Sequence, residues 1–246
     1  MSWIKDVVKA AKSRERAVGN RERGNHSLSL SIISAKRQGV NPIIAELKLA
    51  SPSGFRYDID ARKYVKYVES AGAIGLSVIT EPIAFKGSYG ILREASSLVK
   101  VPVLMKDFVV TEGQVRDAYV LGADAVLLIV SIIGEEETLK RLYNLVHLLG
   151  MEALVEVHSE KDLNIASGLK PRIVGVNARD LLTLRIDYQQ QERILSALPG
   201  NIIKIAESGI ESCERISKLK SLGTDGFLIG TSLIKNKEKI NGFLHA

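Results

Sequence analysis

The sequence predicts a (β/α)8 barrel, in which eight parallel strands close into a cylinder inside a ring of helices. The chain has 246 residues, and about 250 is usual for one such barrel. From residue 43 onward, short apolar runs alternate eight times with longer segments of helical period. Six of these runs end in polar residues or a glycine, at the position where barrels bind ligands. We therefore expect one α/β domain spanning residues 1–246.

The expected strands are near-continuous apolar runs, which favours buried parallel strands over a half-exposed antiparallel sheet. They are Ile43–Lys48, Gly75–Thr80, Val103–Lys106, Ala125–Val130, Ala153–Val157, Ile173–Asn177, Ile202–Ala206 and Gly226–Ile229. The similar phrases GADAV (122–126) and GTDGF (223–227) each lead from a helix into a strand, as repeated βα units require.

Helices are expected where a helical period ends at a glycine or follows a capping residue. Between the strands these are Asp60–Ala71, Glu112–Leu121 after Thr111, Glu135–Leu149 and Glu211–Leu222. Two further helices, Trp3–Arg14 and Leu28–Arg37, precede the first strand. Residues 1–41 are thus predicted to form a helical extension that covers the barrel or braces its site.

The composition is that of a globular chain, with 46% hydrophobic and 25% charged residues. Its longest apolar run, Ala125–Ile133, is far shorter than the ~20 residues that span a bilayer. Charged residues interrupt the first turns at Asp6 and Lys9, unlike a signal peptide. We expect a cytoplasmic protein without a membrane partner, in which the lone Cys213 is a structural helix residue.

Lysine and arginine outnumber acidic residues by 34 to 28, which suits an anionic ligand. The basic cluster Arg14–Gly24 has no aromatic residues between its charges, so we interpret it as a solvated connector and expect no nucleic-acid partner. The four histidines show no ligand spacing, and no GxGxxG or P-loop motif is present. The sequence predicts neither a metal nor a cofactor. It leaves the oligomeric state open, a monomer included.

The earlier strand ends carry candidate acid and base groups. Glu46 and Lys48 are two residues apart, so their side chains share one face of the strand; a rim ion pair is the alternative. The following loop, Leu49–Phe55, has the composition of a mobile cover over a substrate. Lys106 ends an apolar strand, where we expect a lowered pKa suited to a general acid, or else a lysine that reaches to solvent. Glu156 is a candidate base.

Four later residues complete the ring of polar groups: Asn177, Arg179, Glu207 and Ser208. Arg179 is suited to hold a carboxylate through two hydrogen bonds, and Glu207 to orient Arg179 or Asn177. A structural ion pair is the alternative for either residue.

A phosphate site is expected in the loops after the last two strands. Gly209 and Gly230 occupy these loops, and glycine lets backbone N–H groups approach an anion closely. Thr231 and Ser232 follow the second glycine, where barrels often begin a short helix. The joint placement predicts a phosphorylated ligand.

These residues resemble the indole-3-glycerol phosphate synthase family from about Trp3 to the C-terminus. The resemblance rests on the ordered segments IAELKLASPSG, LSVITEPIAFKGSYGIL, VPVLMKDFVV, ADAVLLIVSII, LVEVHS, VGVNARDLLTLRID, IAESGI and FLIGTSL. Leu49 stands where the family usually has a basic residue, and Ala178 where it commonly has a second asparagine.

The resemblance implies a carbon–carbon lyase of tryptophan biosynthesis that needs no cofactor. Its reaction closes 1-(2-carboxyphenylamino)-1-deoxyribulose 5-phosphate to indole-3-glycerol phosphate, with loss of carbon dioxide and water. By this resemblance Lys106 protonates the substrate ketone, Glu156 stabilises the cationic intermediate or accepts a proton, and Glu46 with Lys48 completes the dehydration. The residues implied around the anthranilate part are Pro52, Phe85, Phe108, Asn177, Arg179, Leu181, Leu184, Glu207 and Ser208, and Ser51 is a further substrate-binding residue.

Two other functions fit part of the sequence. Phosphoribosylanthranilate isomerase, a related phosphate-binding barrel, uses a Cys and Asp pair, whereas Cys213 is expected on a helix. A non-catalytic nucleic-acid binder would match the basic pI of about 9.3. It would not explain the carboxylates at the strand ends.

Overall fold

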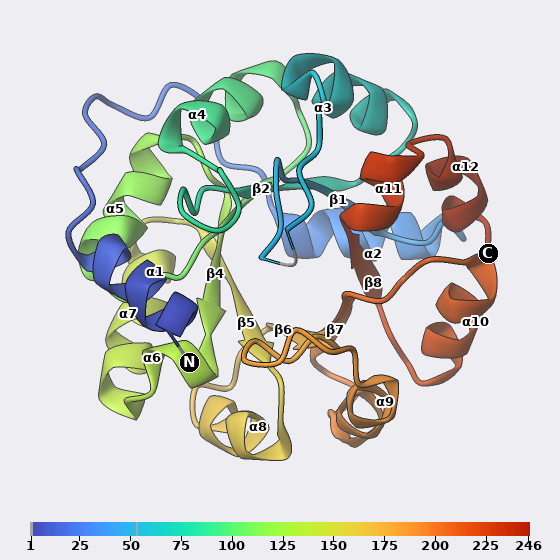
Figure 1. The fold of residues 1–246 in the computed structure, drawn as a ribbon. Coiled ribbons are helices and arrows are strands. Elements are labelled where there is room, and N and C mark those ends of the chain that lie inside the picture. Colours follow the sequence, from blue (N-terminus) through green and yellow to red (C-terminus); the bar gives the residue numbers. More distant parts are fainter. Residues whose placement is uncertain (1, 53) are drawn as a thin grey trace.

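The computed structural model describes residues 2–52 and 54–246 and shows a closed barrel of eight parallel strands in sequence order (Figure 1). The strands are β1 Ile43–Leu47, β2 Gly75–Ile79, β3 Val103–Lys106, β4 Ala125–Ile129, β5 Glu152–Val157, β6 Ile173–Asn177, β7 Ile203–Glu207 and β8 Gly226–Ile229. The first strand pairs with β2 on one side and with β8 on the other, which closes the cylinder. The predicted fold class is confirmed.

The strand bounds follow the prediction closely. β3, β6 and β8 have their predicted bounds, and the other strands differ from the prediction by one residue at one or both ends. Val130 was expected in β4, but it begins the short helical turn α6 Val130–Ile133.

Helices form the outer ring around the strands (Figure 1). They are α3 Ala61–Ser70, α4 Tyr89–Leu98, α5 Glu112–Val120, α7 Glu136–Leu148, α8 Glu160–Ser167, α9 Tyr188–Ala197, α10 Cys213–Ser221, α11 Thr231–Lys235 and α12 Lys239–Leu244. The predicted N-cap Thr111 is confirmed, with a full capping box. Asp60 and Glu135, expected inside helices, are N-caps, and α10 starts two residues later than predicted because Ser212 caps it. Among the described residues, no helix is both long enough and apolar enough to cross a membrane.

The barrel interior is an apolar cluster separate from the shell between strands and helices. Its strand residues include Ile44, Leu104, Leu154 and Ile205, all at most 1% exposed. Side chains two apart on a strand point to the same side. The residue two positions after each of these is therefore also directed inward, one step nearer the carboxyl end of the barrel.

The N-terminal extension contacts both ends of the barrel. Helix α1 (Ser2–Lys12) contributes Trp3 to a cavity at the carboxyl ends of the strands. Helix α2 (Leu28–Arg37) instead packs Leu28 and Ile32 into the interior cluster, and Ser29 donates its backbone N–H to Glu152 at the start of β5. The segment between them, residues 13–27, is called the strap below, and it runs outside α5 and α4 (blue in Figure 1).

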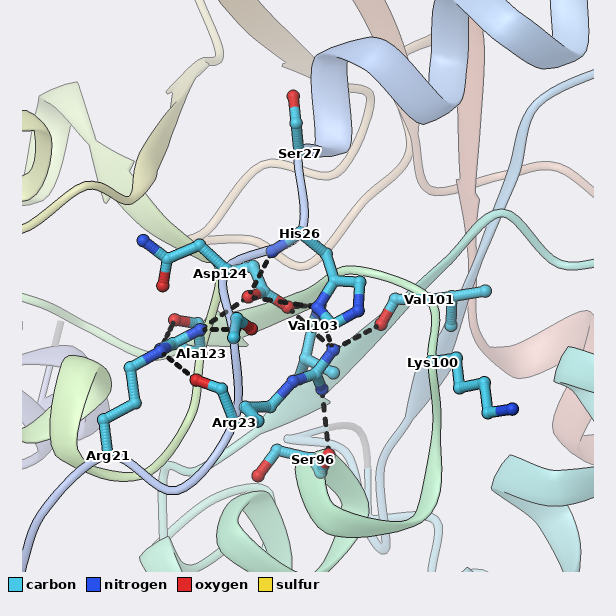
Figure 2. Close-up of polar contacts among 12 residues, drawn as sticks. Arg21, Arg23, His26, Ser27, Ser96, Lys100, Val101, Val103, Ala123 and Asp124 are labelled. Carbon is cyan, nitrogen blue, oxygen red and sulfur yellow. Dashed lines mark hydrogen bonds and ion pairs between the residues drawn. The ribbon is translucent and has the colours of Figure 1, made fainter.

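The strap is bound to the barrel through buried carboxylates, so its interpretation as a solvated connector is wrong. Asp124 Oδ1 accepts hydrogen bonds from Arg21 Nη2 at 2.7 Å and from the His26 N–H at 3.0 Å (Figure 2). Its Oδ2 lies 3.2 Å from Arg23 Nη2 and accepts from the Val103 N–H at 2.9 Å. Sequence alone did not reveal these partners because they lie about 100 residues downstream.

The aspartates of the two repeated phrases have the same role. Asp124 precedes β4, and its carboxylate accepts a hydrogen bond from the first N–H of β3. Asp225 precedes β8, and its carboxylate accepts one from the Lys204 N–H of β7. Each also binds a cation of the extension, since Lys36 of α2 forms an ion pair with Asp225. The extension is thus attached at two equivalent points of the barrel.

Candidate active site

A cavity of about 360 Å³ lies at the carboxyl ends of the strands. Most of the sequence-predicted site residues line it: Glu46, Lys48, Ser51, Pro52, Phe85, Lys106, Phe108, Glu156, Asn177, Arg179, Leu181, Leu184, Ser208 and Thr231. The strand alternation explains this convergence, because the interior residues Ile44, Leu104, Leu154 and Ile205 each precede by two positions a polar group that faces the same way.

Lys106 is the centre of the charged groups. Its Nζ lies 2.7 Å from Glu207 Oε2, 3.2 Å from Glu46 Oε2 and 4.0 Å from Glu156 Oε2. Burial alone would lower the pKa of Lys106, but the three carboxylates more than offset burial and raise it. The expected lowering of the pKa is therefore wrong, because the groups in contact with the Lys106 ammonium are carboxyl groups rather than cations. In the free site Lys106 is a firmly held ammonium.

Glu46 joins the two lysines of the site. Its carboxylate lies 3.1 Å from Lys48 Nζ and 3.2 Å from Lys106 Nζ. The side chains of Glu46 and Lys48 are 6% and 12% exposed, so this is an interior pair and not one on the solvated rim. Burial would raise the pKa of Glu46, but the two ammonium groups outweigh it and hold the carboxylate ionised.

Glu156 and Glu207 are two buried carboxylates in opposite states. Burial is the main cause of the raised pKa of Glu207, which Glu156 reinforces and Lys106 opposes. Burial acts on Glu156 as well, but its pKa is lowered because His158 and Lys106 favour the anion. Two close carboxylates do not both ionise readily, so Glu207 is the one that retains a proton.

His158 is a component of the site that the sequence reasoning missed. Its Nε2 lies 3.1 Å from Glu156 Oε1, and its side chain is 11% exposed. Burial disfavours the imidazolium, but contact with Glu156 outweighs burial and raises the pKa of His158. The available signal was its position two residues after Glu156, which directs both side chains to the same side.

Apolar side chains form one wall of the cavity. The predicted residues Pro52, Phe85, Phe108, Leu181 and Leu184 all line it. Trp3 was not predicted there, and its ring meets that of Phe108 edge to face, with centroids 5.9 Å apart. A flat aromatic ligand would fit against such a wall.

The loop after β1 reaches over the cavity. Ser53, part of the predicted mobile cover, lies outside the described residues. On either side of it, the Ser51 N–H donates to the Phe55 carbonyl at 2.9 Å, and Ala50 forms an antiparallel bridge with Arg56. Both Ser51 and Phe55 line the cavity.

A buried carboxylate shapes the loop after β2. Glu81 is 1% exposed and accepts the backbone N–H groups of Ile83, Ala84 and Phe85 at 2.6 to 2.9 Å. These bonds fix the turn that carries the Phe85 ring to the cavity wall. The sequence prediction did not include Glu81, because the partners of its carboxylate are backbone atoms.

Asn177 and Arg179 organise the loop after β6. Asn177 Oδ1 accepts the Arg179 N–H at 2.9 Å, and Arg179 Nη1 donates to the Leu184 carbonyl at 2.7 Å. Glu207, expected to orient one of these two residues, hydrogen-bonds Lys106 instead. Its 0% exposed side chain supports the ammonium from the barrel interior.

A second cavity of about 80 Å³ adjoins the first at the ends of β7 and β8. It is lined by the predicted phosphate residues Gly209, Gly230, Thr231 and Ser232, together with Lys48 and Ser208. Gly209 has a φ of +68°, which glycine adopts without strain. A Cβ at Gly230 would collide with Glu46 Oε1, so only glycine leaves that carboxylate in place.

Cys213 lies at the start of α10, as the sequence predicted. It lines neither cavity. The Cys and Asp chemistry considered as an alternative therefore has no thiol at either cavity.

Comparison with known proteins identifies the family. The family model described as indole-3-glycerol phosphate synthase matches residues 2–244. The chain belongs to the indole-3-glycerol phosphate synthase family. The family named from the sequence motifs is thus confirmed, and with it the class of enzyme, a decarboxylating lyase of tryptophan biosynthesis.

Relatives within the family match over most of their length. An indole-3-glycerol phosphate synthase of Sulfurisphaera tokodaii is 49% identical over 238 residues, which cover 97% of this chain and 96% of that protein. One from Thermoanaerobacter sp. (strain X514) is 39% identical and covers 85% of this chain and 81% of its own. One from Bacillus mycoides is 41% identical and covers 82% and 80%.

Solved structures outside the family share the barrel. The N-acetylmannosamine-6-phosphate 2-epimerase from Clostridium perfringens superposes with a TM-score of 0.63 at 14% identity, covering 92% of this chain and 98% of that one. At such identity the likeness shows the fold alone.

Proposed function

We propose that this chain closes the indole ring of indole-3-glycerol phosphate by general acid and base catalysis, with Lys106 as the acid. The substrate is 1-(2-carboxyphenylamino)-1-deoxyribulose 5-phosphate, as in the rest of the family. The observation that carries the proposal is the position of Lys106 Nζ, within 4.0 Å of three carboxylates beside an apolar wall. No cofactor enters the reaction.

Ring closure comes first. The aromatic carbon that bears the carboxylate attacks the ketone carbon, and Lys106 donates a proton to the ketone oxygen as that oxygen gains charge. The ring becomes cationic, and the Glu156 anion stabilises it. The bond to the carboxylate then breaks, its electron pair returns to the ring, and carbon dioxide leaves.

Dehydration completes the indole. The new hydroxyl group leaves as water, and a neighbouring methylene carbon loses a proton to form the ring double bond. Glu46 and Lys48, 3.1 Å apart, supply a base and an acid for these two transfers. Since Glu46 also lies 3.2 Å from Lys106, a proton has a short path between the two steps.

Binding uses opposite sides of the site. We place the phosphate at the backbone of Gly209 and Gly230, with Thr231, Ser232 and Lys48 assisting. The anthranilate ring lies against Phe108 and the other apolar walls, near Arg179. Such a substrate occurs where phosphorylated metabolites are made, so we propose a cytoplasmic enzyme formed by a single domain of residues 1–246.

Turnover of the substrate tests this proposal. Purified protein mixed with the substrate, without added metal or cofactor, is expected to release indole-3-glycerol phosphate, seen by indole fluorescence, and carbon dioxide in equal amounts. Carbon dioxide without the fluorescent product would mean a simple decarboxylase. Absence of both would overturn the proposal.

A further inference from the structure

The four arginines of the strap bind carboxylates at different positions along the barrel axis. Arg21 and Arg23 bind Asp124 before β4 (Figure 2), and Arg16 binds Asp117 of α5. Arg14 binds Asp107, which directly follows Lys106 and lines the cavity. Among the strap arginines, Arg14 is thus the one that reaches the catalytic end.

Asp107 is the centre of a buried set of hydrogen bonds. Its side chain is 0% exposed, and its Oδ2 accepts from both Arg14 Nη1 and Thr80 Oγ1. Its Oδ1 accepts from Arg14 Nη2 at 3.3 Å and from the Phe108 N–H at 2.8 Å. Arg14 also lies 5.1 Å above the centre of the Tyr89 ring. The guanidinium is therefore fixed on two sides.

Hydrogen bonds hold the backbone on both sides of Asp107, from the Lys106 carbonyl to the Phe108 N–H. The Lys106 carbonyl accepts a hydrogen bond from the Thr80 N–H at 3.0 Å. Two residues after Lys106, the Phe108 N–H donates to Asp107 Oδ1 at 2.8 Å. Phe108 in turn carries the aromatic wall. Lys106 and Phe108 thus lie on one short segment of chain, and the Asp107 carboxylate between them helps to fix its position.

We propose that Arg14 is a positioning residue for ring closure, which holds Asp107 and through it places Lys106 and Phe108 for the reaction. The proposal rests on the proposed role of Lys106. A catalytic group that moves by an ångström can lose much of its effect. Arg14 would then contribute to catalysis, whereas the other three arginines of the strap contribute to stability.

Arg21 and Arg23 provide matched controls. The Arg14 and Arg23 side chains are 14% and 12% exposed, that of Arg21 is 6%, and the partner aspartates are 0% exposed. Asp124 lines neither cavity, and the first residue of β4 that does, Leu127, comes three positions later, about 10 Å along the strand. Loss of a buried ion pair is common to all three substitutions, whereas only Arg14 adjoins the site.

The experiment compares Arg14→Met with Arg21→Met and Arg23→Met in the full chain. We expect Arg14→Met to lower kcat about 10- to 100-fold, with a smaller rise in KM. The two control variants lower Tm but leave kcat within about twofold, because Asp124 is remote from the reaction. Equal kcat in all three variants, or a loss of kcat that follows Tm alone, would overturn the proposal.

Rescue separates positioning from folding. In Arg14→Ala, millimolar ethylguanidinium is expected to restore part of kcat in a saturable manner, while sodium chloride at equal ionic strength does not. Arg14→Lys, which keeps the charge but loses the planar fork, is expected to be intermediate, and it replaces Arg14→Met if that variant does not fold. Failure of ethylguanidinium to restore any rate in a folded Arg14→Ala protein counts against the proposal.

Lys106→Met, measured in parallel, distinguishes the role of Arg14 from the role of Lys106. If Lys106→Met is inactive while Arg14→Met is fully active, only the role of Arg14 fails. If Lys106→Met retains the normal rate, the role of Lys106 fails, and Arg14 then has no acid to position.

Discussion

Glu207 Oε2 accepts a hydrogen bond of 2.7 Å from Lys106 Nζ, and the Glu207 side chain is 0% exposed. The lysine thus rests on a carboxylate that solvent does not reach. Such a contact fixes the ammonium in direction as well as in charge. Because Glu207 is buried, its protonation is coupled to folding, and this coupling can be measured as a pH dependence of stability.

Lys106→Met is expected to lower kcat by ~10²-fold or more, the scale of general acid catalysis. Methionine has a similar length but can neither donate the proton nor carry the charge. Lys100 is exposed and lies before β3, so Lys100→Met serves as the control and should change neither rate nor Tm. Steady-state kinetics on both variants decide the matter. Near-normal turnover by Lys106→Met would mean that another residue is the general acid, with Lys48 the first candidate.

Glu207→Gln is expected to change how stability depends on pH. The pKa of Glu207 is raised above 4.5, so above pH 4.5 the folded state binds more protons than the unfolded chain and wild-type stability falls as pH rises. Glutamine cannot titrate. Urea unfolding from about pH 5 to about pH 8 should show the wild type losing up to ~1.4 kcal/mol per pH unit relative to the variant. Parallel curves would show that Glu207 is ionised throughout.

His158→Gln should change the pH dependence of stability in the same direction. The pKa of His158 is raised above 6.5, so its contribution is present below pH 6.5 and is lost as pH rises through the folded-state pKa. The variant should be less stable by about 1–3 kcal/mol near pH 6, and the gap should narrow as pH rises above 6.5. Exposed His245 provides the control substitution, His245→Gln. A gap that does not change with pH would rule out a charged His158.

Gly230→Ala tests the geometry around Glu46. The sequence alone predicts only a raised KM for substitutions at Gly230, through phosphate binding. Because a Cβ there collides with Glu46 Oε1, we also expect kcat to fall by about 10-fold. A Cβ at Gly200 would meet open space, so Gly200→Ala is the control. Unchanged kcat and KM in Gly230→Ala would separate this loop from the site.

Arg179→Lys is expected to cost about 1.5–3 kcal/mol in kcat/KM, since lysine loses the planar fork. The guanidinium has a second task, because its Nη1 holds the Leu184 carbonyl at 2.7 Å. Binding of two unreactive substrate analogues, in which the ketone is reduced to an alcohol and the carboxylate is present or absent, can separate the two tasks. If Arg179→Lys weakens binding of both analogues equally, Arg179 acts through the loop rather than through the carboxylate.

Strand positions and the ring of polar groups could be predicted from sequence because both follow from local patterns. Apolar runs located β3, β6 and β8 to the residue, and strand ends pointed to Lys106 and Glu156. Helices α4, α8 and α9 were not predicted individually. Their N-caps Ser88, Ser159 and Asp187 were readable signals, as was Gly168 directly after α8, whereas α4 and α9 have no glycine directly after their last residue.

What could not be predicted depends on partners far apart in the chain. The direction of the Lys106 pKa shift required knowing that Glu46, Glu156 and Glu207 surround the ammonium. The strap was misjudged for the same reason, because Arg14 and Asp107 are 93 positions apart. Charge patterns report which residues are ionised, whereas burial and pairing arise only when the barrel closes.

The pairing of β1 with β8 has a consequence for synthesis of the chain. β1 is made first, yet one of its edges acquires its partner only when residues 226–229 leave the ribosome. Until then a nascent chain presents an unpaired strand rich in isoleucine, the kind of edge that recruits other chains. Closure between the first and last strands is also a contact of high sequence separation, which slows folding. The unpaired edge of β1 is therefore open to aggregation from the synthesis of β1 until β8 has been made.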